Sequence, residues 1–156
     1  MIYVFDSNSL IALGSFYPSR FPTLWASIDG MIAAGTLISV REAHREIDAY
    51  ADTDVITDWA KRNSNIFAPP SASESLFVAQ IFSVPHFRTL ISRQSMLEGR
   101  PVADPFVVAA ARHYSGCVVT EERLRPHAAK IPNVCVHFSI PYMNLEQFMD
   151  MQGWKF

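Results

Sequence analysis

Short apolar runs alternate along the chain with longer segments in which apolar residues recur every three or four positions. Four runs rich in β-branched, aromatic or sulfur-containing residues predict short buried strands, at residues 2–5, 36–40, 117–120 and 133–137. The first run, Ile2-Tyr3-Val4-Phe5, has no charged or amide side chain, which is the pattern of a central strand in a parallel sheet. We expect the rest of the fold to be built around it.

The longer segments predict helices between the strands. In residues 21–34, for example, Leu24, Trp25 and Ile28 share one face, and Gly35 follows as a C-cap. Helices are expected at residues 9–13, 21–34, 41–50, 54–62, 74–83, 87–97, 104–114 and 144–151, a Pro-containing loop at 64–73 and a connector at 99–101. Strands that alternate with helices predict an α/β fold, with a parallel sheet covered by helices on both faces. Because no composition break interrupts this pattern, we expect a single domain over residues 1–156.

Composition narrows the class of protein. Hydrophobic residues make up 49% of the 156 positions, which fits a well-packed globular chain. No apolar run approaches the roughly 20 residues of a membrane helix, so we expect no membrane contact. The chain opens on a strand rather than on a basic, Leu-rich signal, which predicts a cytoplasmic protein. Cys117 and Cys135 lie in apolar runs without metal-ligand spacing and are expected to be buried thiols.

The net charge of −2 hides an uneven distribution. Residues 1–58 contain eight acids and three arginines, whereas residues 86–130 contain seven Lys or Arg and four acids. Ten of the thirteen cations are arginines, which suit bidentate contacts to phosphate. A nucleic acid, if one binds, must therefore use a local basic patch, and a mixed solvated surface is the alternative.

Acidic residues follow two of the predicted strands directly. Asp6 comes after residues 2–5, and Glu121 and Glu122 come after Thr120. The carboxyl ends of parallel strands lie along one edge of a sheet, where open α/β sheets bind ligands, so these acids should lie together. The alternatives are that Asp6 only caps the next helix and that the two glutamates form an exposed acidic turn.

Two further acids lie on predicted helices. Glu46 sits about 100° from the centre of the apolar face of residues 41–50, where its side chain can reach a cleft. Glu42 is one turn earlier and more outward, so it ranks second. Asp104 precedes Pro105, which fits an N-cap followed by proline at the first helical position, and a capping carboxylate still has an oxygen free for a metal. A solvated or i,i+4-paired Glu46 and a purely capping Asp104 stay open as alternatives.

Carboxylates that meet in one crevice repel each other, and a divalent cation removes that repulsion. With oxygen ligands and no His or Cys grouping, the metal should be Mg²⁺ or Mn²⁺ rather than Zn²⁺. Such a site suits the attack of water on a phosphodiester. Asn8 and Thr120 are candidates to orient a ligand carboxylate, the water or the phosphate. Arg123 and Arg125 are candidate phosphate contacts, with an ordinary surface role as the alternative.

Four segments carry a resemblance to a known family: Val-Phe-Asp-Ser-Asn-Ser-Leu-Ile, Arg-Glu-Ala-His-Arg-Glu-Ile, Ala-Asp-Pro-Phe-Val-Val-Ala-Ala-Ala and Val-Val-Thr-Glu-Glu. In this order they resemble the PIN-domain ribonucleases, and above all a branch of short bacterial proteins related to VapC toxins. Lys-Ile-Pro-Asn-Val-Cys at 130–135 is similar to a segment of that branch. The resemblance implies a three-layer α/β/α sandwich and an Mg²⁺- or Mn²⁺-dependent endoribonuclease. For toxin members it also implies a homodimer and an antitoxin encoded alongside.

The resemblance also implies roles for individual residues. Asp6, Glu46 and Asp104 match the three acidic metal ligands of the family, Glu122 matches the fourth, and Asn8 matches the polar residue two positions after the first acid. Three positions depart from the family pattern. Ser7 stands where Thr is more usual, the longer Glu122 stands in place of Asp, and Leu124 stands where a last acid is frequent. The second metal position is therefore open, and Glu121 can substitute for Glu122 as the fourth ligand.

The leading hypothesis is a metal-dependent RNA endonuclease that acts as a translation-blocking toxin. An aspartyl phosphatase or phosphotransferase with Asp6 as nucleophile is disfavoured, because Asn8 stands where such enzymes commonly carry a second acid. A catalytically inert PIN-like binding module is compatible with the departures at Glu122 and Leu124. The large apolar residues between 21 and 83 fit either the core or a groove that receives an amphipathic antitoxin segment.

Overall fold

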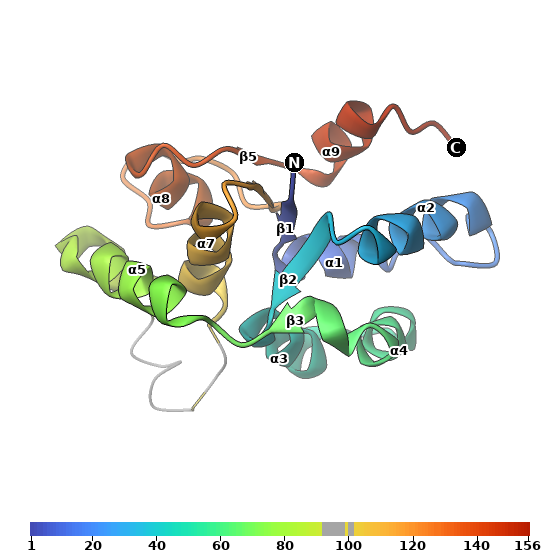
Figure 1. The fold of residues 1–156 in the computed structure, drawn as a ribbon, viewed down its shortest axis with the longest axis horizontal. Coiled ribbons are helices and arrows are strands. Elements are labelled where there is room, and N and C mark those ends of the chain that lie inside the picture. The colour runs from blue at the N-terminus through green and yellow to red at the C-terminus, as the bar shows by residue number, and fades with distance from the viewer. Residues whose placement is uncertain (92–98, 100–101) are drawn as a thin grey trace.

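The structure of the chain is a computed structural model that describes residues 1–91, 99 and 102–156. Its centre is a parallel five-stranded sheet in the order β3-β2-β1-β4-β5 (Figure 1). The strands are β1 (Tyr3–Phe5), β2 (Leu37–Val40), β3 (Phe67–Ala68), β4 (Cys117–Val119) and β5 (Tyr142–Met143). The predicted α/β sandwich with a small central parallel sheet is confirmed.

Strand β1 occupies the middle of the sheet, as its apolar sequence predicts. Val4 pairs with Ile38 of β2 on one side and with Val118 of β4 on the other. Val4 and Phe5 are completely buried, because helices cover both faces of the strand. Asp6 therefore leaves the sheet at its centre, with a strand end on either side.

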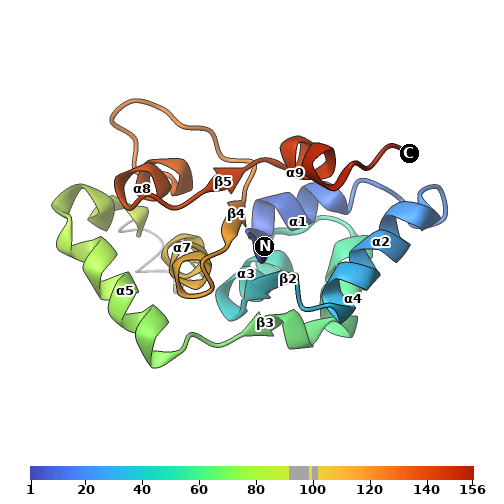
Figure 2. The same ribbon diagram turned by 45° about the horizontal axis from the view of Figure 1, so that its top comes forward.

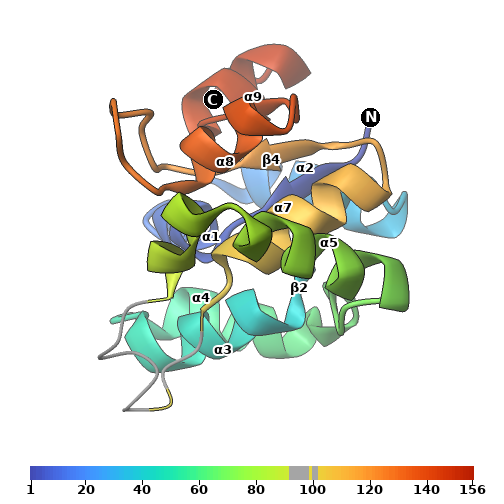
Figure 3. The ribbon, with the colours of Figure 1, turned by 90° about the vertical axis from the view of Figure 1, so that its left-hand side faces the viewer.

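The helices form the outer layers. They are α1 (Ser7–Leu13), α2 (Pro22–Ala33), α3 (Arg41–Tyr50), α4 (Asp54–Arg62), α5 (Ala72–Ser83), α7 (Asp104–His113), α8 (Ile131–His137) and α9 (Leu145–Gln152), with 3-10 turns at Ser64–Ile66 and Pro85–Leu90. Helices α5 and α7 lie on one side of the sheet, and α1 and α2 lie on the other (Figure 2). Along the sheet, α8 and α9 lie toward the β5 edge and α3 and α4 toward the β3 edge (Figure 3).

The large apolar side chains of the first half pack in the core rather than forming a groove. Trp25, Trp59 and Phe77 are buried, and the two indole rings lie 6.0 Å apart. Phe21 and Phe82 are partly buried and pack against the same core. Cys117 and Cys135 are buried free thiols, as predicted, and burial raises their pKa to about 11 and about 12.

The strand predicted at residues 133–137 is wrong, because this segment is helix α8. Pro132 lies in the first turn, where its missing N–H has no helical partner to lose. Ile131 and Val134 are buried, whereas Val136 is 57% exposed, so the segment buries one side with helical rather than strand periodicity. The strand that completes this edge of the sheet is β5, which follows the helix.

The edge strand β3 also differs from the prediction, since it lies within the expected loop at 64–73. It has two residues and stops at Pro69, which cannot donate to a ladder. The helix predicted at 87–97 is wrong over its first residues, because Pro85–Leu90 forms a 3-10 turn. Residues 92–98 of that prediction and residues 100–101 of the connector lie outside the described residues. Among the helices of the described residues, none is long and apolar enough to cross a membrane.

Candidate metal centre

Three carboxylates from distant parts of the chain meet at the carboxyl edge of the sheet. One oxygen each of Asp6, Asp104 and Glu122 lies within 4.8 Å of the other two. Asp6 directly follows β1, Asp104 is the first residue of α7, and Glu122 lies in the segment after β4. The parallel sheet produces this meeting, because β1 and β4 are neighbours and end at the same edge.

Asp6 is buried and holds two different partners with its two oxygens. Its Oδ1 accepts a hydrogen bond of 2.8 Å from the backbone N–H of Ser7, which makes it the N-cap of α1. Its Oδ2 accepts a hydrogen bond of 3.3 Å from the hydroxyl of Thr120. Asp6 therefore both caps α1 and belongs to the acidic group.

Asp104 does not cap α7, contrary to the prediction. The N-cap is Ala103, and Asp104 and Pro105 are the first two helical residues. The carboxylate consequently makes no side-chain cap bond and is left to face the other acids. Burial raises its pKa well above the usual range, and the charges of Asp6 and Glu122 raise it further.

Glu122 is half-buried, and hydrogen bonds fix both its backbone and its carboxylate. Its backbone N–H donates to the Thr120 hydroxyl oxygen at 3.2 Å. Its Oε2 accepts a hydrogen bond of 2.8 Å from the backbone N–H of Ile131 at the start of α8. Although Glu is longer than Asp, this contact sets the direction of the side chain.

Glu46 lies beside the three acids rather than within the 4.8 Å group. Its Oε1 accepts a hydrogen bond of 3.1 Å from the hydroxyl of Ser7, the residue after Asp6. Burial, followed by the charge of Asp104, raises the pKa of Glu46 to about 7. Because Glu46 contacts Ser7 and interacts electrostatically with Asp104, it lies at the border of the same crevice.

Glu42 is buried, so the expectation that it points outward is wrong. It lies in the first turn of α3, at the end of β2, and Arg41 folds over it. The Arg41 guanidinium contacts Glu42 Oε1 at 2.8 Å through Nη2 and at 3.1 Å through Nε. This local ion pair engages Oε1 of Glu42, whereas Oε2 is buried without a hydrogen-bond partner among the described residues.

The electrostatics of the crevice fit a divalent cation. Burial raises the pKa of Asp6 to about 8, and the charges of Glu122 and Glu46 contribute to this rise. The charge of Lys130 lowers the pKa of Asp104, but burial and the neighbouring acids outweigh it. Buried carboxylates that repel each other in this way are stabilised in the ionised form by a hard cation with oxygen ligands. The donor set therefore matches Mg²⁺ or Mn²⁺.

The remaining predicted residues surround the acids without joining them. Asn8 Oδ1 accepts a hydrogen bond of 3.0 Å from the backbone N–H of Glu121 and lies 3.4 Å from the Thr120 hydroxyl. Glu121 points to the start of α9, where its Oε1 accepts from the Leu145 N–H at 2.7 Å, so it is not placed as a fourth ligand. Arg123 is exposed and lines a cavity of about 370 Å³ that Glu122 shares.

Ser7 and Lys130 were not singled out as site residues from the sequence. Ser7 orients Glu46 through its hydroxyl, and Lys130 lies close enough to influence Asp104. The signal for Ser7 was its position between Asp6 and Asn8, whereas Lys130 entered only as the first residue of the segment 130–135 that carries part of the resemblance.

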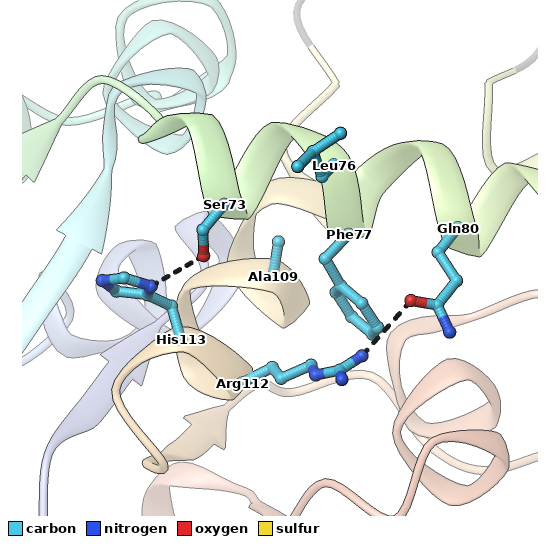
Figure 4. Close-up of a pocket in the computed structure, with 7 residues that line it drawn as sticks. All are labelled: Ser73, Leu76, Phe77, Gln80, Ala109, Arg112 and His113. Atoms are coloured by element: carbon cyan, nitrogen blue, oxygen red, sulfur yellow. Dashed lines mark hydrogen bonds between the residues drawn. The ribbon is translucent and has the colours of Figure 1, made fainter.

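A second hollow, of about 320 Å³, lies between α5 and α7 (Figure 4). There the Ser73 hydroxyl and His113 Nδ1 are 3.0 Å apart, and the Arg112 guanidinium lies 4.3 Å from the centre of the Phe77 ring. Arg112 is in the last turn of α7 and Asp104 is its first residue, which separates the two places by about 12 Å along the helix. None of the described residues that line this hollow is an acid, so it offers no carboxylate ligand.

The fold and the crevice together define the class: an α/β protein with a central parallel sheet and a candidate metal centre at the carboxyl edge of that sheet. The family described as Domain of unknown function (DUF4411) matches residues 3–156, and the chain belongs to this family. No curated protein matches the sequence.

Two solved structures are similar to the chain. The crystal structure of FitAcB from Neisseria gonorrhoeae has 13% identity and a TM-score of 0.49, over 92% of this chain and 97% of that one. The structure of FitAB bound to an IR36 DNA fragment has 14% identity and a TM-score of 0.50, over 92% of this chain and 94% of that one. At this identity the second likeness concerns the fold alone, and it agrees with the parallel α/β architecture.

Proposed function

We propose that this protein is an Mg²⁺- or Mn²⁺-dependent endoribonuclease that hydrolyses RNA phosphodiester bonds as the toxin of a toxin–antitoxin pair. The observation that carries the proposal is the meeting of Asp6, Asp104 and Glu122 within 4.8 Å. Three buried or half-buried acids come together here from three elements, and burial raises the pKa of Asp6 and of Asp104, so a shared cation would remove the cost of keeping them ionised.

The side chains divide into those that hold the ion and those that hold its ligands. Asp6, Asp104 and Glu122 are the ligands, and Glu46, fixed by Ser7, faces them as a fourth acid for the ion or for water. A bound Mg²⁺ or Mn²⁺ supplies charge stabilisation at a phosphate and lowers the pKa of bound water. Thr120 orients Asp6 through its hydroxyl, and Asn8 fixes the backbone at Glu121, so both act as positioning residues.

The toxin role, the antitoxin partner and the homodimer rest on the resemblance of four ordered segments to VapC-like proteins. RNA as substrate is supported by the three cations of the 121–130 segment next to the acids, since the protein as a whole has a net charge of −2. A toxin of this kind acts in the cytoplasm, where it meets its RNA.

The test is to incubate the purified protein with total RNA and millimolar Mg²⁺ or Mn²⁺, with chelator as control, and to map the cut ends. We expect Asp6→Ala and Asp104→Asn to abolish cleavage, because each removes a charged ligand, while circular dichroism and unfolding remain cooperative. Asp29→Asn, at an exposed position in α2, is the matched control and should cleave normally. Full metal-dependent cleavage by Asp104→Asn would contradict the proposal.

A catalytically inert PIN-like module is the second candidate. It is favoured by Leu124, which is 51% exposed at the position where the family pattern has a last acid. Such a module would retain the crevice without enough ligands to bind the ion in a productive way. Absence of cleavage together with absence of metal binding would establish this candidate in place of the nuclease.

A further inference from the structure

A cationic cavity borders the acidic crevice. It has a volume of about 370 Å³, and its lining consists of Glu121, Glu122, Arg123, Arg125 and Lys130. Glu122 belongs to the metal centre as well, so the cavity and the centre share a wall. Arg123, Arg125 and Lys130 are all exposed and accessible to a ligand from solvent. We refer to residues 121–130, which carry these cations, as the basic loop.

The basic loop is held in one shape by side chains outside it. Asn133 of α8 donates through Nδ2 to the backbone carbonyl of Arg125 at 2.8 Å and accepts from the Lys130 N–H through Oδ1 at 3.3 Å. His86 Nε2 lies 3.0 Å from the carbonyl oxygen of Ala128. The side-chain amide of Asn133 therefore fixes the backbone at both Arg125 and Lys130. Because the loop is preorganised in this way, a ligand does not have to lose free energy in ordering it.

Lys130 interacts electrostatically with the acidic centre, since its positive charge lowers the pKa of Asp104. It makes no ion pair shorter than 4.0 Å in the described residues, where the carboxylate pairs are those of Arg41 and His44. Lys130 and Glu122 line the same cavity, so an ammonium without a close carboxylate partner in the described residues lies beside the acidic centre and can pair with a phosphate there. Guanidinium groups on the same loop add contacts to further phosphates.

We propose that the basic loop is the subsite that binds the phosphate backbone of single-stranded RNA, with Lys130 at the phosphate beside the acidic centre and Arg123 and Arg125 at neighbouring phosphates. This inference rests on the proposed nuclease function. It adds that the bound RNA extends from the metal centre toward the start of α8. Recognition by charge alone makes the subsite independent of base sequence.

Metal-free binding tests the subsite separately from catalysis. A fluorescently labelled single-stranded RNA is titrated with the full-length protein in chelator, by anisotropy, at several KCl concentrations. Each lost phosphate contact should weaken binding about fivefold near 100 mM salt and reduce the slope of log K against log salt by about 0.7. We expect this change for Lys130→Gln and for Arg125→Gln. Lys61→Gln and Arg62→Gln, at exposed positions in the last turn of α4, are the matched controls and should bind like wild type.

The outcomes separate the subsite from the nuclease. Unchanged affinity and slope in Lys130→Gln and Arg125→Gln would overturn the subsite even if wild type cleaves RNA with metal, and so would an equal loss in the α4 controls. A wild-type protein that binds RNA through the basic loop but never cleaves it would overturn the nuclease and keep the loop as an RNA-binding surface. RNA binding without salt dependence would exclude phosphate contacts altogether.

Discussion

At the scale of single residues, Asp6 shows why the sequence left two interpretations open. A carboxylate after a buried strand fits a helix cap and fits a ligand, and here one oxygen caps α1 while the other faces Thr120 beside the acids. The two roles use different oxygens, so neither excludes the other. The cap bond and the Thr120 hydrogen bond together hold the carboxylate in place, with one of its oxygens within 4.8 Å of Asp104 and Glu122.

Asp104→Asn should stabilise the metal-free protein, because it removes a destabilising buried charge. With Mn²⁺ it should lower stability relative to wild type, because it removes a ligand of the ion. The pKa of Asp104 is raised in the folded protein, so its contribution is favourable at low pH, where it is protonated, and is lost as pH rises. In chelator, we expect the variant to match wild type near pH 3.5, below the ordinary pKa of about 3.9 of an unfolded Asp, and to be more stable at pH 8 by about 1–2 kcal/mol, or roughly 3–8 °C in Tm. Thermal unfolding at the two pH values measures this difference.

The control for this prediction is Asp29→Asn, because Asp29 is exposed in the middle of α2. It should show the same Tm as wild type at both pH values. If Asp104→Asn were also indistinguishable from wild type at pH 8, the carboxylate would be ionised without strain and the electrostatic account of the crevice would be wrong.

The sequence identified the acids better than it placed them. Asp6 and Glu122 follow from strand ends, and Asp104 from its proline, since each depends on a short local pattern. Glu42 could not be placed in this way, because it is buried and its Oε1 is paired with the guanidinium of Arg41, which helical periodicity does not predict. The relative rank of two acids one turn apart is decided by a neighbouring side chain rather than by helical periodicity.

At the scale of elements, Gly116 determines how closely α7 and β4 approach the start of β1. A Cβ at this position would collide with the backbone carbonyl oxygen of Ile2, which accepts the ladder hydrogen bond from Cys117 at 2.9 Å. A backbone atom in a ladder cannot move aside as a flexible side chain can. We expect Gly116→Ala to destabilise the protein by about 2–3 kcal/mol, measured by denaturant unfolding.

Gly30 supplies the comparison. It lies inside α2, and a Cβ there meets nothing within 4 Å. Gly30→Ala should therefore stabilise the protein by roughly 0.5–1 kcal/mol, because alanine has less conformational freedom to lose and favours the helix. Equal effects of the two substitutions would show that the approach of Ile2 does not constrain residue 116.

Elements with a strong local pattern were predicted well, and those that depend on their neighbours were not. The bounds of α3 and α4 match the sequence expectation, because both have a clear apolar face. Helix α8 was taken for a strand because Val-Cys-Val is β-prone, and its conformation is set by Pro132 and by contacts with α7. The two-residue strand β3 has too little sequence to form a pattern and exists only because β2 offers an edge.

At the scale of the whole molecule, the acidic centre connects parts of the chain that no local interaction joins. Asp6 lies at the end of the first strand, whereas Asp104 and Glu122 belong to the second half of the sequence. An ion held by all three links α7 and the segment after β4 to the middle of the sheet. Its binding energy is then available to the folded state alone, because an unfolded chain cannot bring the three acids together.

Mn²⁺ should therefore raise the stability of the whole protein, and more so at pH 8 than at pH 6. The gain is RT ln(1+[L]/Kd), which is about 2.7 kcal/mol at one hundred times Kd. At pH 6 protons compete for the ligands, since the pKa of Asp6 is about 8 and that of Glu46 about 7, so the apparent Kd rises. Unfolding followed over a Mn²⁺ titration at both pH values measures the gain, with Asp104→Asn as the variant that should lose it. A wild-type Tm that does not move at millimolar Mn²⁺ and pH 8 would favour the inert module over the nuclease, because the acids would then meet without holding an ion.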